Sequence, residues 1–173
     1  GYLFFRAWFL LLLATHKYIS GDDKWARSFP VTGYHDEKFE WDAHRIAERL
    51  ESQYRAHPEG PHCENTKIWP FCNAAGGLGM YLYDKVFGKN THVAFENFIG
   101  YAKENYFRRG PNGQLQSVTS YYDPIEKFHA GGAVAGGLMT CHLLQPQNPE
   151  LGKLLYDAAA TALGWRNPDG AAA

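Results

Sequence analysis

The chain has 173 residues, of which 45% are apolar and 16% aromatic, and its 17 Lys and Arg nearly balance its 18 Asp and Glu. This composition excludes intrinsic disorder, because so apolar a chain buries enough surface to offset its loss of conformational entropy. Three cysteines are too few for a disulfide-stapled miniprotein. The balanced charge, without a long Lys/Arg run, argues against nucleic acid as a partner.

The sequence opens on an apolar stretch, and we expect a buried helix over residues 4–19 that ends at Ser20 and Gly21. Arg6 interrupts this stretch, whose longest uncharged piece is well short of the ~20 residues that a membrane span requires. We expect membrane association only through segments outside this chain, and the compartment stays open between periplasm, membrane surface and cytoplasm. The start at Gly1 without Met and the end in three alanines indicate a single partial domain over residues 1–173 that continues beyond both ends.

Amphipathic and apolar helices alternate along the rest of the chain. After a loop with Pro30 and Gly33, three- and four-residue steps predict an amphipathic helix over 37–56, with a face formed by Phe39, Ala43, Ile46, Leu50 and Tyr54. An apolar helix is expected over 72–87, stopped by Gly88, and an amphipathic one over 91–106. After a short extended piece over 116–121, a third such pair is expected over 130–144 and 148–163.

Three helix pairs predict an all-α fold. Ala75-Gly76-Gly77-Leu78 and Ala135-Gly136-Gly137-Leu138 lie 60 residues apart, each in the first helix of its pair. Self-similar helix pairs are typical of toroids and solenoids, and three pairs make about half of a six-pair α/α toroid. Each glycine weakens a helix by ~1 kcal/mol, so these glycines serve either close helix packing or room for a central ligand.

A loop with two cysteines is the most informative segment. Trp69 precedes a proline and is pushed towards extended backbone, so the next helix starts after that proline, with Cys72 in or just before its first turn. Unpaired N–H groups and the helix dipole favour a thiolate there and lower its pKa. Cys63, nine residues earlier, can approach it. Two thiols beside Trp69 and Phe71 predict an apolar pocket with a few proton-transfer groups.

Three other interpretations of the two cysteines stay open: a disulfide, two buried small side chains, or a metal site with His62. The metal site is disfavoured, since the spacing fits no common zinc pattern and a fourth ligand is not apparent. Cys141, inside an apolar helix, is expected in the core. His129 is expected to begin a Gly-rich helix just after Tyr122, which makes it a candidate functional histidine.

Cys63-Glu64, Cys72-Asn73 nine residues later and a helix that ends in Tyr83-Asp84 before Gly88 resemble the linalool dehydratase/isomerase family. The resemblance covers residues 5–160 and is carried mainly by the cysteine segment. It implies an (α,α)6 barrel that assembles into a homo-oligomer, needs no cofactor, and adds or removes water at an allylic alcohol of a monoterpene skeleton.

The resemblance also implies roles for single residues. The two family cysteines correspond to Cys63 and Cys72, both placed around the substrate alcohol. The family's catalytic histidine falls near Trp8, and its pocket tyrosine falls near Gly131 or Gly132, where His129 can substitute. These departures imply a shared scaffold and thiol pair with a changed substrate and a changed proton-transfer group.

We therefore expect a lyase or isomerase that acts on a small terpenoid or other apolar alcohol. Cys63 and Cys72 act at the hydroxyl, with Glu64 or His129 assisting, since a positioned acid or base adds about 10²–10⁴-fold in rate. Aromatic faces stabilise a developing cation by roughly 0.5–2 kcal/mol each. The expected substrate-binding residues are Trp69, Phe71, Asn73, Tyr81 and Tyr122.

Two rival functions stay open. A carbohydrate-active α/α toroid, such as a glycan lyase, hydrolase or epimerase, would place paired carboxylates at the ring opening, and this chain offers few clustered Asp and Glu. A non-catalytic helical subunit would simply bury its cysteines. Thiol reactivity separates these functions, because a low-pKa, alkylatable Cys72 is expected of the first and inert thiols of the last.

Overall fold

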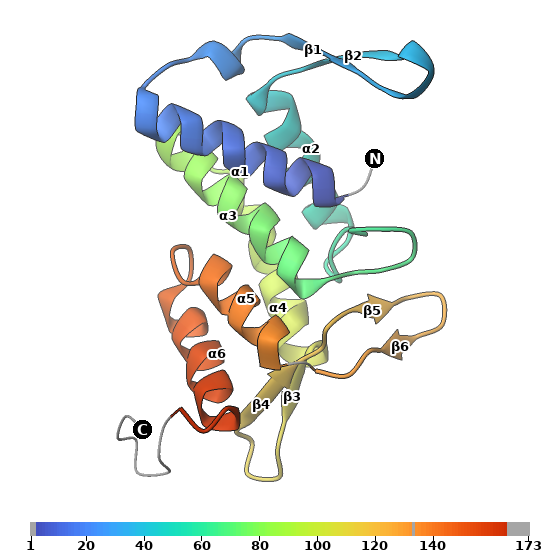
Figure 1. The fold of residues 1–173 in the computed structure, drawn as a ribbon, viewed down its shortest axis with the longest axis vertical. Coiled ribbons are helices and arrows are strands. Elements are labelled where there is room, and N and C mark those ends of the chain that lie inside the picture. Colours follow the sequence, from blue (N-terminus) through green and yellow to red (C-terminus); the bar gives the residue numbers. More distant parts are fainter. Residues whose placement is uncertain (1–2, 133, 166–173) are drawn as a thin grey trace.

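The structure, a computed structural model, describes residues 3–132 and 134–165. Within these ranges six α-helices form three consecutive pairs, and three two-stranded antiparallel sheets lie in the connections (Figure 1). The predicted all-α fold class is therefore wrong, and so is the all-α toroid that was expected from it. The end residues, on which the expectation of a longer protein rests, lie outside the described ranges.

Helix α1 spans Leu3–Ser20 and ends where Gly21 adopts a φ of +71°, as the sequence predicts. Burial on all sides is not observed, because five large apolar or aromatic side chains of α1 are more than half exposed: Phe4, Phe5, Leu12, Tyr18 and Ile19. The buried side consists of Leu3, Arg6, Ala7, Leu10, Leu13 and Ala14. None of the helices in the described ranges combines the length and the apolarity needed to cross a membrane.

Strands β1 (Phe29–Thr32) and β2 (Lys38–Trp41) pair antiparallel before helix α2 (Ala43–Ala56) begins. The helix predicted from residue 37 therefore starts too early. Its true start is set by Asp42, whose carboxylate accepts a hydrogen bond from the first-turn backbone at 2.8 Å. Phe39 lies on β2 and is 42% exposed, so it is not part of the buried helix face.

The second pair consists of α3 (Pro70–Phe87) and α4 (Phe95–Asn105), close to the predicted ranges. Pro70 occupies the first turn of α3, where its missing N–H breaks no helical hydrogen bond. Gly88 ends the helix with a φ of +63°. The Asp84 carboxylate accepts hydrogen bonds from two backbone N–H groups of the linker, at 2.9 and 2.7 Å, and so fixes the connection to α4.

Two hairpins separate the second and third helix pairs. β3 (Phe107–Arg109) pairs with β4 (Leu115–Val118), and β5 (Tyr122–Asp123) pairs with β6 (Phe128–His129). The extended piece predicted over 116–121 overlaps β4 in part. Strands of two to four residues carry too little periodicity to be recognised in the sequence.

The third pair consists of α5 (Val134–Leu144) and α6 (Pro149–Ala162). The prediction that His129 begins a helix is wrong, because this residue lies on β6, before α5. Asn148 caps α6, since its side chain accepts a hydrogen bond from the backbone N–H of Leu151 at 3.1 Å.

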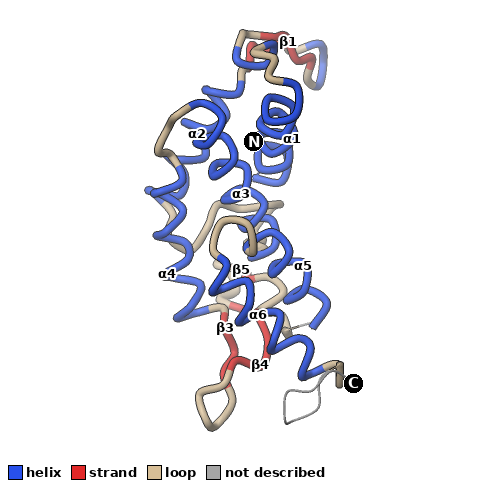
Figure 2. The backbone as a smooth tube through the Cα atoms, turned by 90° about the vertical axis from the view of Figure 1, so that its left-hand side faces the viewer, coloured by secondary structure: helices blue, strands red, loops and turns tan. Residues whose placement is uncertain are grey.

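Helices α1, α3 and α5 form a row, and α2 and α4 lie along one side of it (Figures 1 and 2). Helix α6 packs against α5 and strand β4. The core between the row and its flanking helices is rich in aromatic rings, with Tyr54 of α2 and Phe95 of α4 5.3 Å apart. Side chains from all three helix pairs take part in the same core.

The glycines of α3 allow close helix packing. A Cβ atom at Gly76 would clash with the hydroxyl of Tyr54, and one at Gly79 would lie 3.1 Å from the backbone nitrogen of Leu11 on α1. At Gly137, in the matching motif of α5, no atom of the described residues lies within 4 Å of the Cβ position. Packing is therefore the reason for the glycines in α3, but it does not explain Gly137.

We predict that Gly76→Ala lowers the free energy of unfolding by about 1–3 kcal/mol, because the added methyl group overpacks the contact with Tyr54. Helix propensity alone gives the opposite sign, a gain of about 0.5–1 kcal/mol. Gly100→Ala in α4 is the matched control, since its Cβ position has no neighbour within 4 Å in the part of the chain that the structure describes, and it should show that gain. Urea denaturation measures the free energy of unfolding of both variants. An equal increase in Gly76→Ala and Gly100→Ala would contradict the packing argument.

Candidate functional site

The two cysteines of the predicted site lie side by side in the interior. Cys63, in the loop before α3, is 1% exposed, and Cys72, in the first turn of α3, is 4% exposed. The two side chains lie close enough to interact, and Cys63 is the largest influence on the pKa of Cys72. Both are free thiols, so the disulfide interpretation does not hold in this structure.

Cys72 is held in its protonated form. The interaction with Cys63 and burial raise the pKa of Cys72, and the charges of Cys63 and the Glu64 carboxylate act in the same direction. The predicted lowering of this pKa by the helix N-terminus is therefore wrong, because the neighbouring thiol and the loss of solvent outweigh the helix dipole. Cys72 therefore stays protonated at neutral pH and is not a ready nucleophile.

Tyr54 of α2 belongs to the same cluster. Its hydroxyl donates a hydrogen bond to the carbonyl oxygen of Asn73 at 3.0 Å. Burial, and then the neighbouring Cys72 and Cys63, raise the pKa of Tyr54. In the sequence this tyrosine is one of several apolar-face residues of an amphipathic helix, and only the packing of α2 on α3 distinguishes it from the others.

The loop that carries Cys63 is anchored to strand β5. The backbone N–H of Cys63 donates to the carbonyl of Lys67 at 2.9 Å, and Ile68 and Tyr122 exchange two backbone hydrogen bonds of 2.8 Å. The Lys67 ammonium forms a hydrogen-bonded ion pair with Asp123. This contact lowers the pKa of the Asp123 carboxyl to about 2.

Aromatic rings flank the cysteine segment. The ring of Phe71 lies 5.5 Å from that of Trp8 on α1, and the ring of Trp69 lies 5.0 Å from that of Tyr121. The indole nitrogens of Trp8 and Trp69 are buried and find no hydrogen-bond partner among the described residues. Trp8, where the resemblance places the family's histidine, thus supplies an aromatic surface next to Phe71.

Two other predicted substrate-binding residues have different surroundings. Asn73 is fully buried, and its amide nitrogen donates to the carbonyl of Trp69 at 3.0 Å, so it supports the turn into α3. Tyr81 lies nine residues beyond Cys72, which is about 13 Å along a helix axis. Its ring packs 5.5 Å from that of His92. The fold therefore keeps Tyr81 apart from the thiols.

His129 and Tyr122 form a second cluster on the β5–β6 hairpin. Their rings lie 4.5 Å apart, and the ring of Tyr106 lies 5.8 Å from that of His129. Burial, and then the positive charge of Arg108, lower the pKa of His129. This cluster joins the cysteine loop through the pairing of Ile68 with Tyr122.

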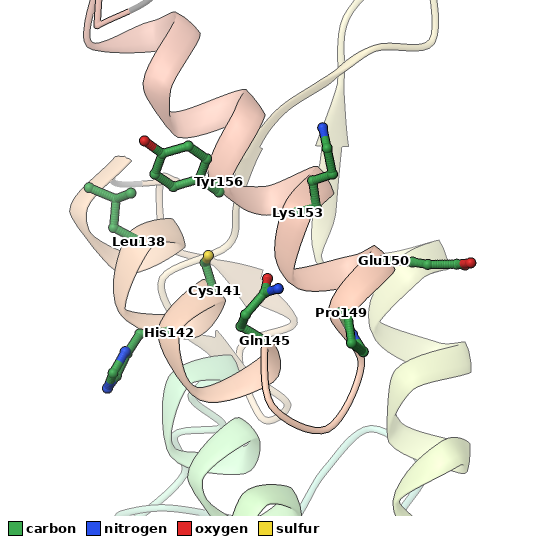
Figure 3. A pocket seen from close by; sticks show the side chains of 8 residues that line it. All are labelled: Leu138, Cys141, His142, Gln145, Pro149, Glu150, Lys153 and Tyr156. Carbon is green, nitrogen blue, oxygen red and sulfur yellow. The ribbon is translucent and has the colours of Figure 1, made fainter.

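A groove of about 690 Å³ lies between α5 and α6 (Figure 3). Cys141 lines it, and its thiol donates to the carbonyl of Gly152 at 3.1 Å. In Figure 3 His142 and Glu150 point away from this cysteine, and Lys153 forms an ion pair with a carboxylate of its own helix. Cys141 is buried, as predicted, and the groove does not bring an acid and a base together.

No group of three or more His, Cys, Asp and Glu in the described ranges is placed to hold a metal ion. Glu64 is exposed at the rim of the cysteine loop, where its backbone pairs with Lys67. The buried thiol pair with its aromatic neighbours is therefore the arrangement in the described structure that best fits a reaction centre.

A family model described as linalool dehydratase/isomerase matches residues 3–173, nearly the whole chain. The matched range includes both cysteines of the pair, the turn into α3 and all three helix pairs. No curated protein sequence matches the chain.

We predict that Asp123 contributes stability that is lost in acid. Its pKa is about 2 in the folded chain and about 3.9 when unfolded, so the contribution is complete above about pH 5 and is lost as the pH falls towards 2. In Asp123→Asn the free energy of unfolding should therefore fall less over this interval. Urea denaturation at stepped pH measures the slope. Lys67→Met should flatten it as well, and unchanged slopes in both variants would refute the role of the ion pair.

We also predict that the native thiols react slowly with iodoacetamide at pH 8, and that all three react once urea unfolds the chain. The reasons are the burial of Cys63, Cys72 and Cys141 and the raised pKa of Cys72. Mass spectrometry of the alkylated peptides measures each thiol separately. Rapid, selective labelling of Cys72 in the native protein would favour the thiolate expected from the helix dipole instead.

Proposed function

The chain belongs to the linalool dehydratase/isomerase family, and we propose that it removes water from, or moves the hydroxyl group along, a small apolar alcohol of terpenoid type. The observation that carries this proposal is the burial of two interacting free thiols, Cys63 and Cys72, at the start of α3. Family membership supports the reaction class. The aromatic side chains around the thiol segment support an apolar substrate.

Loss of water needs a proton for the leaving oxygen and a base for a proton on the neighbouring carbon. In our proposal the Cys72 thiol gives its proton to the hydroxyl group, the carbon–oxygen bond breaks and water leaves. The thiolate, hydrogen-bonded to Cys63, then takes a proton from the carbon next to the cation, and a double bond forms. The thiol is thereby restored, and one alcohol has become one alkene and one water.

Hydroxyl migration follows from the same steps. Water adds to the other end of the allylic cation, and the proton that it loses returns to the thiolate. The substrate then keeps its composition while its hydroxyl group has moved. Whether the cation loses a proton or regains water decides between the dehydratase and the isomerase outcome.

A raised pKa makes Cys72 a weaker acid, so in this proposal its proton moves only when the leaving oxygen has become strongly basic. The proton stays on Cys72 in the resting protein and is transferred as the substrate oxygen becomes strongly basic during cleavage of its bond to carbon. A positioned acid or base of this kind adds about 10²–10⁴-fold in rate. Burial of the pair excludes water that would otherwise compete as the acid.

We assign the substrate-binding surface to the aromatic rings at the start of α3. Trp69 and Phe71 directly precede Cys72 in the chain, and Trp8 packs against Phe71 from α1. Each ring face that meets a developing allylic cation stabilises it by roughly 0.5–2 kcal/mol. We assign to Asn73 the support of this turn, because its amide nitrogen donates to the backbone carbonyl of Trp69, while its Oδ1 is buried without a partner among the described residues.

Glu64 is the assisting group that we favour over His129. It follows Cys63 directly and interacts electrostatically with Cys72, whereas His129 lies on β6 against Tyr122. An exposed carboxylate at the rim of the loop can exchange protons with solvent between turnovers.

We predict that Cys72→Ala and Cys63→Ala each lower kcat by about 10²–10⁴-fold on linalool or another allylic terpenoid alcohol, with a smaller loss in Glu64→Gln. Cys141→Ala is the matched control, because it removes the same thiol from a buried position between α5 and α6. Gas chromatography of the alkene and of the isomeric alcohol measures both outcomes. Full turnover in both thiol-pair variants would remove this assignment.

A further inference from the structure

A buried guanidinium on α1 lies outside the proposed chemistry of the thiol pair. Arg6 is 5% exposed, and its Nε and Nη2 atoms have no hydrogen-bond partner among the described residues. Both atoms belong to the same edge of the guanidinium, where two N–H bonds point outward almost in parallel. That edge matches the two oxygens of a carboxylate or phosphate group in a bidentate hydrogen bond.

Within the described ranges, the groups that act on Arg6 include no carboxylate. Burial, and then the positive charge of Arg49 on α2, lower the pKa of Arg6, while Tyr54 acts in the opposite direction. The Tyr54 hydroxyl proton is already donated to the carbonyl of Asn73. Because arginine stays protonated in proteins and an unpaired buried charge is strongly unfavourable, this position calls for an anion.

We propose that the Nε–Nη2 edge of Arg6 is an oxyanion site that takes the carboxylate or phosphate group of a small ligand. The site lies where α1 packs against α2, and Arg49, exposed on α2, adds a second positive charge near it. An anion bound here removes both the unpaired charge and the two unsatisfied donors at once.

This site is electrostatically linked to the thiol pair. Tyr54 interacts with Arg6 on one side and with Cys72 and Cys63 on the other. The ligand is a free small oxyanion or the charged head of an apolar molecule. Both present the same chemistry to Arg6, and they differ in how affinity depends on the length of an attached alkyl chain.

The test is thermal unfolding of the purified protein in acetate, octanoate or inorganic phosphate, against chloride at equal ionic strength. We expect Tm to rise by roughly 5–10 °C once the oxyanion exceeds its Kd by about 100-fold. Equal effects of acetate and octanoate identify a free anion, and a stronger effect of octanoate identifies the head of an apolar ligand. Arg6→Met should abolish the rise, and Arg6→Lys should weaken it.

Arg55→Met is the matched control, because Arg55 is an exposed α2 arginine paired with Glu51, and it should keep the full response. If Arg6→Met does not fold, ¹⁵N NMR of the wild-type Nε–H signals decides, since the Arg6 signal should shift on titration with acetate or phosphate. An equal rise in Tm in Arg6→Met and wild type, or an Arg6 Nε–H signal that does not shift, would overturn the proposal. Water would then be the partner of the Nε–Nη2 edge.

Discussion

The close approach of α1 and α3 is the constraint on which the rest of the described structure depends. Leu3 lies against the Cβ position of Gly76, and Leu11 lies against that of Gly79, so the two helices run in the same direction. Their N-terminal ends therefore lie together, and these ends carry Arg6 and, within the first turn of α3, Cys72. A side chain at Gly79 would crowd the backbone of α1, and one at Gly76 would clash with Tyr54 of α2, so both glycines keep α3 close to its neighbours.

Burial then sets the charge state of those groups. It raises the pKa of Tyr54, contributes to the raised pKa of Cys72 and lowers that of Arg6, and in each case the neutral form is favoured. For the two acids, neutrality means that a proton is held close to apolar rings, which is the condition that acid-assisted loss of water requires. The guanidinium of Arg6 stays charged, so its burial favours the binding of an anion.

The position of the thiol pair also depends on a distant hairpin. Lys67 reaches across to Asp123, 56 residues later in the chain, and Ile68 pairs with the neighbouring Tyr122. These contacts hold the loop of Cys63 over the start of α3 from outside the helix rows. Strand β5 thus helps to position the candidate site. The strands that make this a mixed fold therefore have a structural role at the site.

The three helix pairs could be predicted from the sequence, because apolar spacing and the helix ends at Gly21 and Gly88 are local signals. The sequence also identified the cysteine segment and the family. The short hairpins could not be predicted, and His129 lies on one of their strands instead of at a helix start. The direction of the pKa shift of Cys72 could not be predicted either. Tertiary structure decided these, together with the role of Tyr54 and the unsatisfied edge of Arg6. The burial and the hydrogen-bond partners of a side chain depend on the distant groups that the packing of α1, α2 and α3 brings against it. A local sequence pattern does not contain this information.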